Sequence, residues 1–183
     1  MDRQTGLALL KQYIQKEHLI KHMLSVEGCM RAIASTLQEN IDDFGLAGLL
    51  HDIDYELTSE TPEKHGLVGA EILEKHQVSQ AIMQAIKAHS HLSGESRESI
   101  MAKTLYALDP LSGLLIACAL MTPDKKLASI NTPFVLKRFK EKRFAAGANR
   151  EQIKTCETWG MPLDQLIEIS IGAMQKISDE LGL

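Results

Sequence analysis

The stretch Leu49-Leu50-His51-Asp52-Ile53-Asp54 decides how the rest of the chain is interpreted. His51 and Asp52 directly follow the apolar run from Phe44 to Leu50, which is typical of a buried helix. A buried imidazole beside a buried carboxylate costs free energy unless each group finds a partner. A divalent cation would satisfy both groups, and so would a simple His–Asp hydrogen bond in the core. The other polar residues of the chain must decide between these two interpretations.

The composition favours a helical domain. The chain has 183 residues, a length that fits one domain or one domain with a small extension. Hydrophobic residues make up 44% of it, which is enough for a core. Aromatic residues make up only 4%, while leucine, isoleucine, alanine and methionine are plentiful. This balance favours helices over a β-sandwich or barrel, and we predict an all-α fold.

Charge and cysteine content bound the partners and the compartment. The formal net charge of −4 gives no sign of a basic surface, so we predict no nucleic-acid partner. Cys29, Cys118 and Cys156 are widely spaced and show no CxxC, which is typical of reduced thiols in a cytoplasmic protein. The N-terminus lacks the apolar region of a signal peptide, and the run Leu114 to Met121 is too short to span a bilayer. We therefore expect no membrane partner.

Apolar positions at steps of three and four predict helices along the whole chain and no strand. We expect the helices at 4–16, 17–37, 42 or 43 to 51–53, 61–76, 78–89, 97–108, 111–121, 132–147, 150–158 and 163–181. Asp42 or Asp43 is the expected N-cap of the third helix. Because the residue before a proline is disfavoured in the α conformation, we expect Asp109-Pro110 to interrupt a helix, with Asp109 as a candidate N-cap of the next.

Six imidazole and carboxylate side chains lie on or beside the apolar faces of these helices. They are His22, His51, Asp52, His65, His89 and Asp109. Imidazole and carboxylate without thiolate suit iron, manganese, zinc or another borderline cation, and six ligands exceed the need of one tetrahedral zinc. The set indicates two divalent transition-metal ions that share a carboxylate. The histidines His18 and His76, by contrast, are expected to face solvent.

The order of these residues resembles the HD-domain family of metal-dependent phosphohydrolases. The family pattern is an early histidine, an adjacent His-Asp and a distant aspartate, which here are His22, His51-Asp52 and Asp109. The histidines of Lys64-His65-Gly66 and Ala88-His89-Ser90 are similar to those of the two-metal branch, and Leu105–Leu114 is similar to the last-ligand helix. The resemblance covers roughly residues 18–122. It implies the HD-domain helical core.

The resemblance implies hydrolysis of a phosphate ester or anhydride, favouring a nucleotide substrate, by a metal-activated water. Asp52 would bridge two ions, with iron or manganese favoured over zinc, magnesium or nickel. His22, His51 and Asp109 would complete one ion site, and His65 and His89 the other. His91 is the candidate general acid.

Several other residues have only weak expected roles. Asp54 stands where family members often have glycine, and it is expected at most to support a ligand. Lys64, the Lys125-Lys126 pair and the basic residues between Lys137 and Arg143 are candidate phosphate contacts. The simpler interpretation of these cations is a solvated surface.

The HD-domain core is predicted at residues 1–122, with additional C-terminal helices at 123–183 packed on it. These helices would cover the site or form an interface between subunits, such as those of a homodimer. Two rival interpretations stay open. One is a metal-stabilised nucleotide-binding or regulatory module without turnover, and the other is a helical scaffold without metal.

Overall fold

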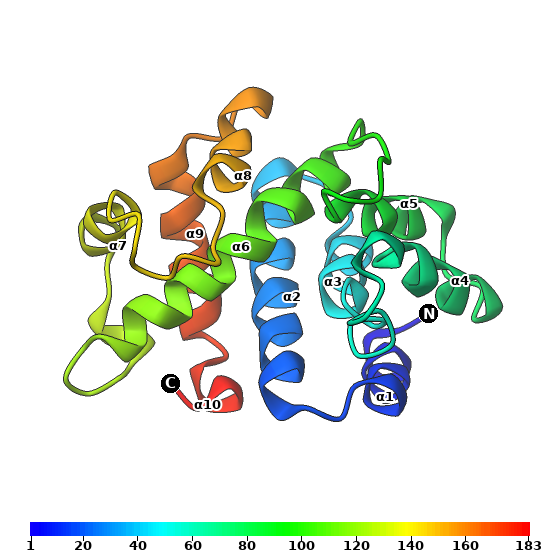
Figure 1. The fold of residues 1–183 in the computed structure, drawn as a ribbon. Helices are drawn as coiled ribbons and strands as arrows, with labels where there is room; N and C mark the ends of the chain where they lie inside the picture. Colours follow the sequence, from blue (N-terminus) through cyan, green and yellow to red (C-terminus); the bar gives the residue numbers. More distant parts are fainter.

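The computed structural model describes residues 1–183 and contains helices joined by turns, with no strand (Figure 1). This confirms the all-α prediction. The α-helices are α1 (Arg3–Tyr13), α2 (Glu17–Leu37), α3 (Ile41–Leu50), α4 (Leu67–Lys75), α5 (Gln80–His89), α6 (Ile100–Leu120), α7 (Thr132–Phe139), α8 (Arg150–Lys154), α9 (Leu163–Gln175) and α10 (Ser178–Leu181). Short 3₁₀ helices cover Pro62–Lys64, Leu127–Ser129 and Thr155–Trp159.

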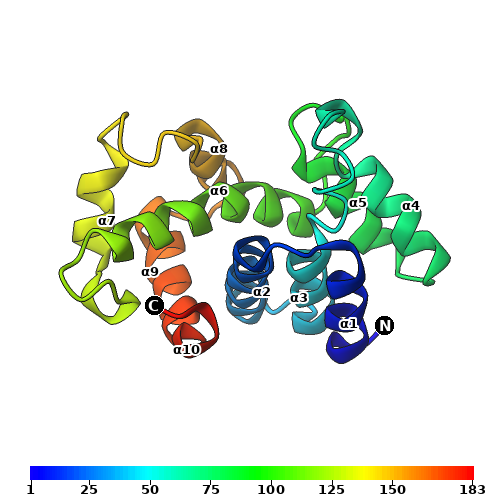
Figure 2. The same ribbon diagram turned by 60° about the horizontal axis from the view of Figure 1, so that its bottom comes forward.

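Helices α2 and α6 form the centre of the molecule, and α6 crosses α2 (Figures 1 and 2). Helices α3, α4 and α5 lie at one end of α6, and α7 lies at the other end. Both central helices are buried along most of one side, because their apolar residues recur at steps of three and four. Their apolar side chains belong to one continuous core that extends from α1 to α10.

Helix α3 packs closely along α2. It is capped by the side chain of Asn40, which accepts hydrogen bonds from the backbone N–H groups of Asp42 and Asp43, so the expected Asp42 or Asp43 cap is wrong. Asn40 precedes the first helical turn and can therefore bond its free N–H groups. Gly48 faces α2, where a Cβ atom would lie 2.9 Å from Cα of Glu27. This packing places His51, at the end of α3, beside α2.

Helix α6 runs unbroken from Ile100 to Leu120 with Pro110 inside it, so the expected interruption at Asp109-Pro110 is wrong. Proline removes one hydrogen bond from a helix interior, but burial on both sides can still hold the helix together. By length and composition alone, α6 is long and apolar enough to cross a membrane. However, 56% of its most apolar stretch is buried inside the protein, as in a core helix.

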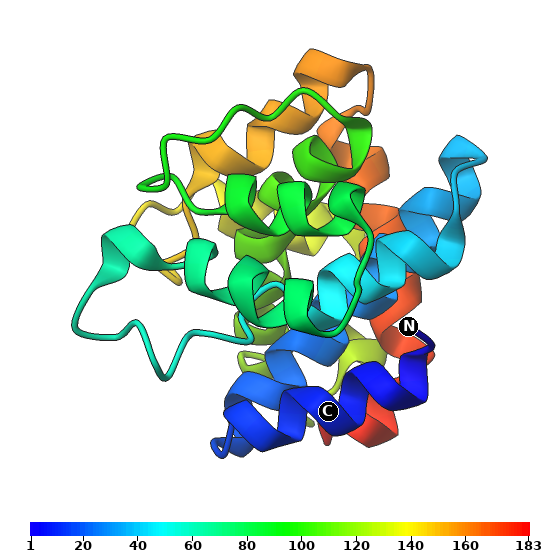
Figure 3. The same cartoon turned by 90° about the vertical axis from the view of Figure 1, so that its right-hand side faces the viewer.

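The segment between α3 and α4 differs from the expectation of one helix over 61–76. A 3₁₀ turn at Pro62–Lys64 ends at His65, Gly66 has a φ of +81°, and α4 begins only at Leu67. The left-handed conformation of Gly66 breaks the helix, and a Cβ there would lie 2.8 Å from the carbonyl oxygen of Ile86. His65 therefore lies on a connection between helices. Figure 3 shows this connection standing out beside α4 and α5.

The C-terminal helices are shorter than expected. Helix α7 ends at Phe139, and turns follow instead of a helix to residue 147. The guanidinium of Arg150 donates to the carbonyls of Phe139, Phe144, Ala145 and Ala148. A helix that continued to residue 147 would use the Phe139 carbonyl itself. The expected helix 163–181 is divided into α9 and α10 at Lys176 and Ile177. The division of the chain at residue 122 stays a prediction.

Candidate metal centre

The six predicted ligands come together from five parts of the fold. His22 lies on α2, His51 and Asp52 follow α3, His65 precedes α4, His89 ends α5 and Asp109 lies within α6. All four imidazole Nε2 atoms approach a carboxylate oxygen of Asp52 or Asp109. Residues up to 87 positions apart therefore meet at one point, as the sequence predicts. Their role as ligands stays a prediction.

Asp52 lies at the middle of the cluster. Its Oδ1 atom is 3.0 Å from Nε2 of His65, 3.2 Å from Nε2 of His89 and 3.4 Å from Nε2 of His51. Its Oδ2 atom is 3.8 Å from Nε2 of His22. One carboxylate thus faces every imidazole of the cluster, which is the arrangement that a shared ligand requires.

Asp109 closes the other side of the cluster. Its Oδ1 atom lies 3.1 Å from Nε2 of His22 and 3.7 Å from Nε2 of His51. These three side chains can hold one cation together, and His51, Asp52 and His89 form a second such group. His51 belongs to both groups, so the cluster is one continuous centre.

The outer nitrogen of each histidine is held by the surrounding protein. Nδ1 of His51 is 2.8 Å from the carbonyl oxygen of Gly48, and Nδ1 of His89 is bonded to the carbonyl of Ile86. A carbonyl only accepts hydrogen bonds, so each of these rings carries its proton on Nδ1. When the ring is neutral, the unprotonated Nε2 faces the centre, which is the tautomer that a metal ligand needs.

His22 and His65 are held by side chains. Nδ1 of His22 lies 3.1 Å from the hydroxyl of Ser112, which itself donates to the Asp109 carbonyl. Nδ1 of His65 lies 2.9 Å from Oδ1 of the buried Asp54. The other oxygen of Asp54 accepts from the backbone N–H groups of Gly66 and Gly69. Asp54 therefore joins His65 to the start of α4, a role that sequence reasoning expected only in outline.

One inner nitrogen lacks a partner within the chain, and two others face each other. Nε2 of His51 is fully buried and makes no hydrogen bond. Nε2 of His65 and Nε2 of His89 face each other at 3.0 Å. A buried polar atom without a partner costs about 1–3 kcal/mol, and two facing ring nitrogens bond only when one of them carries a proton. A divalent cation would serve the unpartnered nitrogen and both facing nitrogens, so the residues present fit a metal centre.

The carboxylates strongly favour positive charge at this point. Burial alone would lower the pKa of His51, but Asp52 and Asp109 outweigh it and raise that pKa to about 9. Burial is likewise outweighed at His65, whose pKa Asp52 and Asp54 raise to about 10. The pKa of the Asp52 carboxyl is lowered, because the histidines overcome the effect of its burial. The negative charge of these carboxylates, which raises the pKa of His51 and His65, would also attract a divalent cation.

The centre opens into a cavity of about 280 Å³. His65, His89 and Asp109 lie on its wall, so a ligand can reach the cluster from solvent. The remaining lining residues include Tyr55, Thr58, Ser59, Pro62, Ser90, His91, Leu92 and Gln152. Gln152 belongs to α8, and no sequence pattern predicted a role for it in the site. A residue beyond position 122 thus contributes to the wall of the cavity.

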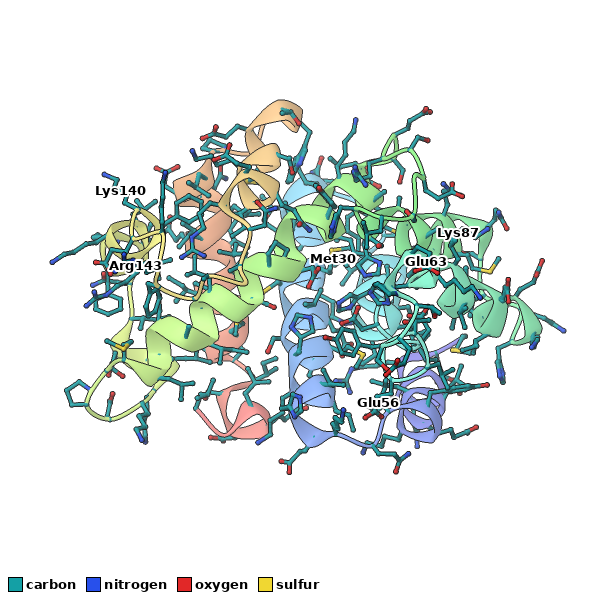
Figure 4. All side chains as sticks on the ribbon, in the orientation of Figure 1. Met30, Glu56, Glu63, Lys87, Lys140 and Arg143 are labelled. Carbon is teal, nitrogen blue, oxygen red and sulfur yellow. The ribbon has the colours of Figure 1, made fainter.

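Of the other residues singled out in the sequence, some line the cavity and others lie on the surface away from it. His91 is exposed and lines the cavity, where its role as general acid stays a prediction. His18 and His76 are exposed, as expected. Figure 4 shows Lys140 and Arg143 on the left of the molecule and Glu56 and Glu63 on the right. Glu56 and Glu63 belong to the segment 55–65, several residues of which line the cavity. These basic side chains do not line the cavity, which leaves them as surface charges.

The helical fold and the buried histidine and aspartate cluster, together with a match to the HD-domain family, define the class as helical metal-dependent phosphohydrolases. A family model described as HD domain matches residues 19–114, just over half of the chain. The chain belongs to the HD-domain family. This confirms the resemblance drawn from His22, His51-Asp52 and Asp109.

Curated relatives are similar to part of the chain. Ribonuclease Y of Geobacter sulfurreducens is 35% identical over 97 residues, which are 53% of this chain and 18% of that protein. Ribonuclease Y of Chloroflexus aurantiacus is 30% identical over 138 residues, or 74% of this chain and 27% of that protein. The chain therefore matches only about a fifth to a quarter of the length of these relatives. No solved structure matches it.

These relatives correct one expectation. Proteins named ribonuclease Y act on RNA, so excluding a nucleic-acid partner from the net charge of −4 was wrong. Net charge is a sum over the whole surface, whereas a metal centre attracts a phosphodiester through its local charge alone. An acidic chain can therefore belong among proteins that act on nucleic acids.

Proposed function

We propose that this chain is a metal-dependent hydrolase of phosphate esters or anhydrides that carry a nucleoside. The observation that carries the proposal is the cluster itself, in which four histidines with fixed Nδ1 atoms direct Nε2 toward two carboxylates. The fully buried and unpartnered Nε2 of His51 is its strongest sign. A purely structural hydrogen-bond network would satisfy this atom.

The ligand set favours two divalent ions, with iron or manganese preferred. His22, His51 and Asp109 would hold one ion, His65 and His89 the other, and Asp52 both. When bound, the ions supply a water that ionises near neutral pH and positive charge for the phosphate oxygens. The oxygen and nitrogen donors, with no thiolate among them, agree with this choice.

The chain itself orients the reaction. The cluster occupies one wall of the cavity, so a phosphate that enters the cavity would meet the centre directly. His91, exposed at the opening, is proposed to protonate the leaving oxygen through its imidazole. The alcohol or nucleotide that leaves would then depart toward solvent.

The rim of the cavity favours a nucleoside over a bare phosphate. Tyr55 and Leu92 line the cavity and leave 46% and 49% of their surfaces exposed. The Tyr55 ring meets His65 edge-on, with 5.7 Å between the ring centroids, so its position relative to the centre is defined. An aromatic face beside a phosphate-binding centre suits a base that stacks there. The unit recognised would be either a free nucleotide or one nucleotide of an RNA.

The kinship to proteins named ribonuclease Y favours RNA as one form of this substrate. The rival interpretation, a metal-stabilised nucleotide-binding or regulatory module, predicts bound metal without turnover. Elemental analysis of protein purified without a histidine tag, followed by hydrolysis of bis(p-nitrophenyl) phosphate with added manganese, separates these cases. We expect about two ions per chain and metal-dependent hydrolysis.

The matched variants are His51→Ala and His76→Ala. His51→Ala removes a central nitrogen and should lower hydrolysis at least about 100-fold, since even outer partners of metal ligands are worth 10- to 100-fold. His76→Ala removes an exposed histidine and should change neither metal content nor rate. Metal without turnover in the unaltered protein would favour the regulatory interpretation. If the protein holds no metal even after reconstitution, the proposed metal centre is wrong.

Tyr55→Ala tests the substrate. Loss of one stacked base costs about 1–3 kcal/mol, so KM for a nucleotide or an oligoribonucleotide should rise about 5- to 100-fold. Hydrolysis of bis(p-nitrophenyl) phosphate should change far less, and Tyr55→Phe should retain the ring and the nucleotide KM. Comparing mononucleotides with oligoribonucleotides then distinguishes the two forms of substrate. Equal losses on all substrates would contradict the base-binding role.

A further inference from the structure

Pro110 creates a defect next to a proposed metal ligand. In a regular helix the N–H of residue 110 would bond to the carbonyl of Tyr106, but proline has no N–H and its ring crowds that carbonyl. Asp109, whose carboxylate approaches His22 and His51, directly precedes this defect. The direction of the Asp109 side chain therefore depends on how the helix passes Pro110.

Gln152 compensates for this defect. Its Nε2 atom donates a hydrogen bond of 2.8 Å to the Tyr106 carbonyl, the acceptor that Pro110 leaves free. Gln152 lies on α8, which packs against α6 (Figure 1) and is outside the region 19–114 that matches the HD-domain family. A side chain of the C-terminal helices thus replaces a missing backbone bond of α6.

The position of Gln152 is itself well determined. The side chain of Asn149 caps α8 by accepting from the N–H groups of Glu151 and Gln152. The Arg150 guanidinium donates to carbonyls of the preceding turns, and Ile153 is fully buried. The cap, the Arg150 hydrogen bonds and the burial of Ile153 therefore fix α8 in place, with the Gln152 amide against α6.

From this geometry we propose that Gln152 is a positioning residue of the metal centre. It sets the course of α6 at Pro110, and with it the Asp109 carboxylate. It also lines the cavity together with Asp109, so part of the site wall comes from the C-terminal helices. This inference rests on the proposed function, because it gives Asp109 the role of a metal ligand.

The test combines Gln152→Met with Pro110→Ala in the full chain. Methionine keeps the length of the side chain without a donor and adds no charge. We expect Gln152→Met to weaken Co²⁺ binding about tenfold, as for other partners that orient metal ligands, and to shift the visible spectrum of the bound Co²⁺. Pro110→Ala restores an N–H to the helix, so the double variant should regain the affinity and spectrum of the unaltered protein.

Gln175→Met is the matched control. The Gln175 amide donates to the Leu127 carbonyl at 2.9 Å, a bond of the same kind, but Gln175 lines a different cavity. It should leave the Co²⁺ affinity and spectrum unchanged. If Gln152→Met binds Co²⁺ like the unaltered protein, or if Pro110→Ala fails to rescue it, the inference is wrong and the proposed function stands. If the unaltered protein binds no Co²⁺, both are wrong.

Discussion

Asp54 shows how one buried carboxylate connects a loop to a metal centre. Its two oxygens face different targets, His65 on one side and the N–H groups of Gly66 and Gly69 on the other. Those N–H groups lie at the start of α4, where the free backbone donors of a helix attract negative charge. The start of α4 thus fixes the Asp54 carboxylate, and the carboxylate in turn orients the His65 ring.

Asp54→Asn is expected to weaken the centre without unfolding the protein. The amide oxygen can still accept a hydrogen bond from a backbone N–H, but the amide NH₂ cannot accept a hydrogen bond from Nδ1–H of His65. His65 would then lose the tautomer that directs Nε2 inward, and metal affinity should fall about 10- to 100-fold. Equilibrium binding of Mn²⁺ or Co²⁺ measures this fall.

Glu60→Gln is the control for this change, since Glu60 is an exposed carboxylate of the same loop. It should leave the metal affinity unchanged. Unaltered affinity in Asp54→Asn would show that His65 is oriented by other contacts, such as that with Tyr55.

At the scale of helices, the contact between α2 and α3 sets the distance between His22 and His51. The centroids of these two rings lie 5.1 Å apart. Gly48 permits this approach, since a Cβ atom there would lie 2.9 Å from both N and Cα of Glu27. These are backbone atoms of α2, which cannot move aside as the end of a side chain can. A side chain at position 48 must therefore push the two helices apart.

Gly48→Ala should destabilise the protein by about 1–3 kcal/mol, the usual cost of overpacking a core. Gly113→Ala provides the opposite control, since Gly113 lies in α6 with no atom within 4 Å of its Cβ position. This change should add about 0.5–1 kcal/mol of stability through better helix propensity. Urea unfolding of both variants measures the two effects. A Gly48→Ala protein as stable as the unaltered protein would show that α2 can shift freely.

At the scale of the whole molecule, one core joins the part that matches the HD-domain family to the C-terminal helices. Cys29 on α2 illustrates this, because its thiol is fully buried and lies 3.8 Å from the carbonyl of Ser170 on α9. Cys118 and Cys156 are also free thiols, and both are buried. Chemistry at Cys29 thus reports on the contact between the two parts of the chain.

Burial raises the pKa of the Cys29 thiol to about 12. Above about pH 9 the unfolded chain loses this proton while the folded chain keeps it, so the unfolded state binds fewer protons and stability falls as pH rises. The contribution is roughly 1.4 kcal/mol for each pH unit. Urea unfolding between pH 8 and 10.5 should therefore show a smaller loss of stability in Cys29→Ala than in the unaltered protein. Parallel curves for the two proteins would contradict the burial of this thiol on folding.

Much of the local structure follows from short-range rules. The spacing of apolar residues predicts most of the helices, since that period depends only on backbone geometry. The predicted helix boundaries are wrong where contacts with residues further along the chain determine the backbone conformation. Helix α6 continues past Pro110, with Gln152 bonded to the carbonyl that the proline leaves free. Helix α7 ends early beside Arg150, and Gly66 breaks the predicted helix against the carbonyl of Ile86.

The sequence by itself determined the helical class and the identity of the six clustered side chains, because residue type and periodicity are local properties. Only the tertiary structure decided which atoms of these side chains meet, that Asp54 supports His65, and that Gln152 belongs to the cavity wall. Gln152 stands 43 positions beyond Asp109, and no short-range pattern relates two residues so far apart. Their shared place on the cavity wall depends on how α8 packs against α6, which follows from the burial of the whole core.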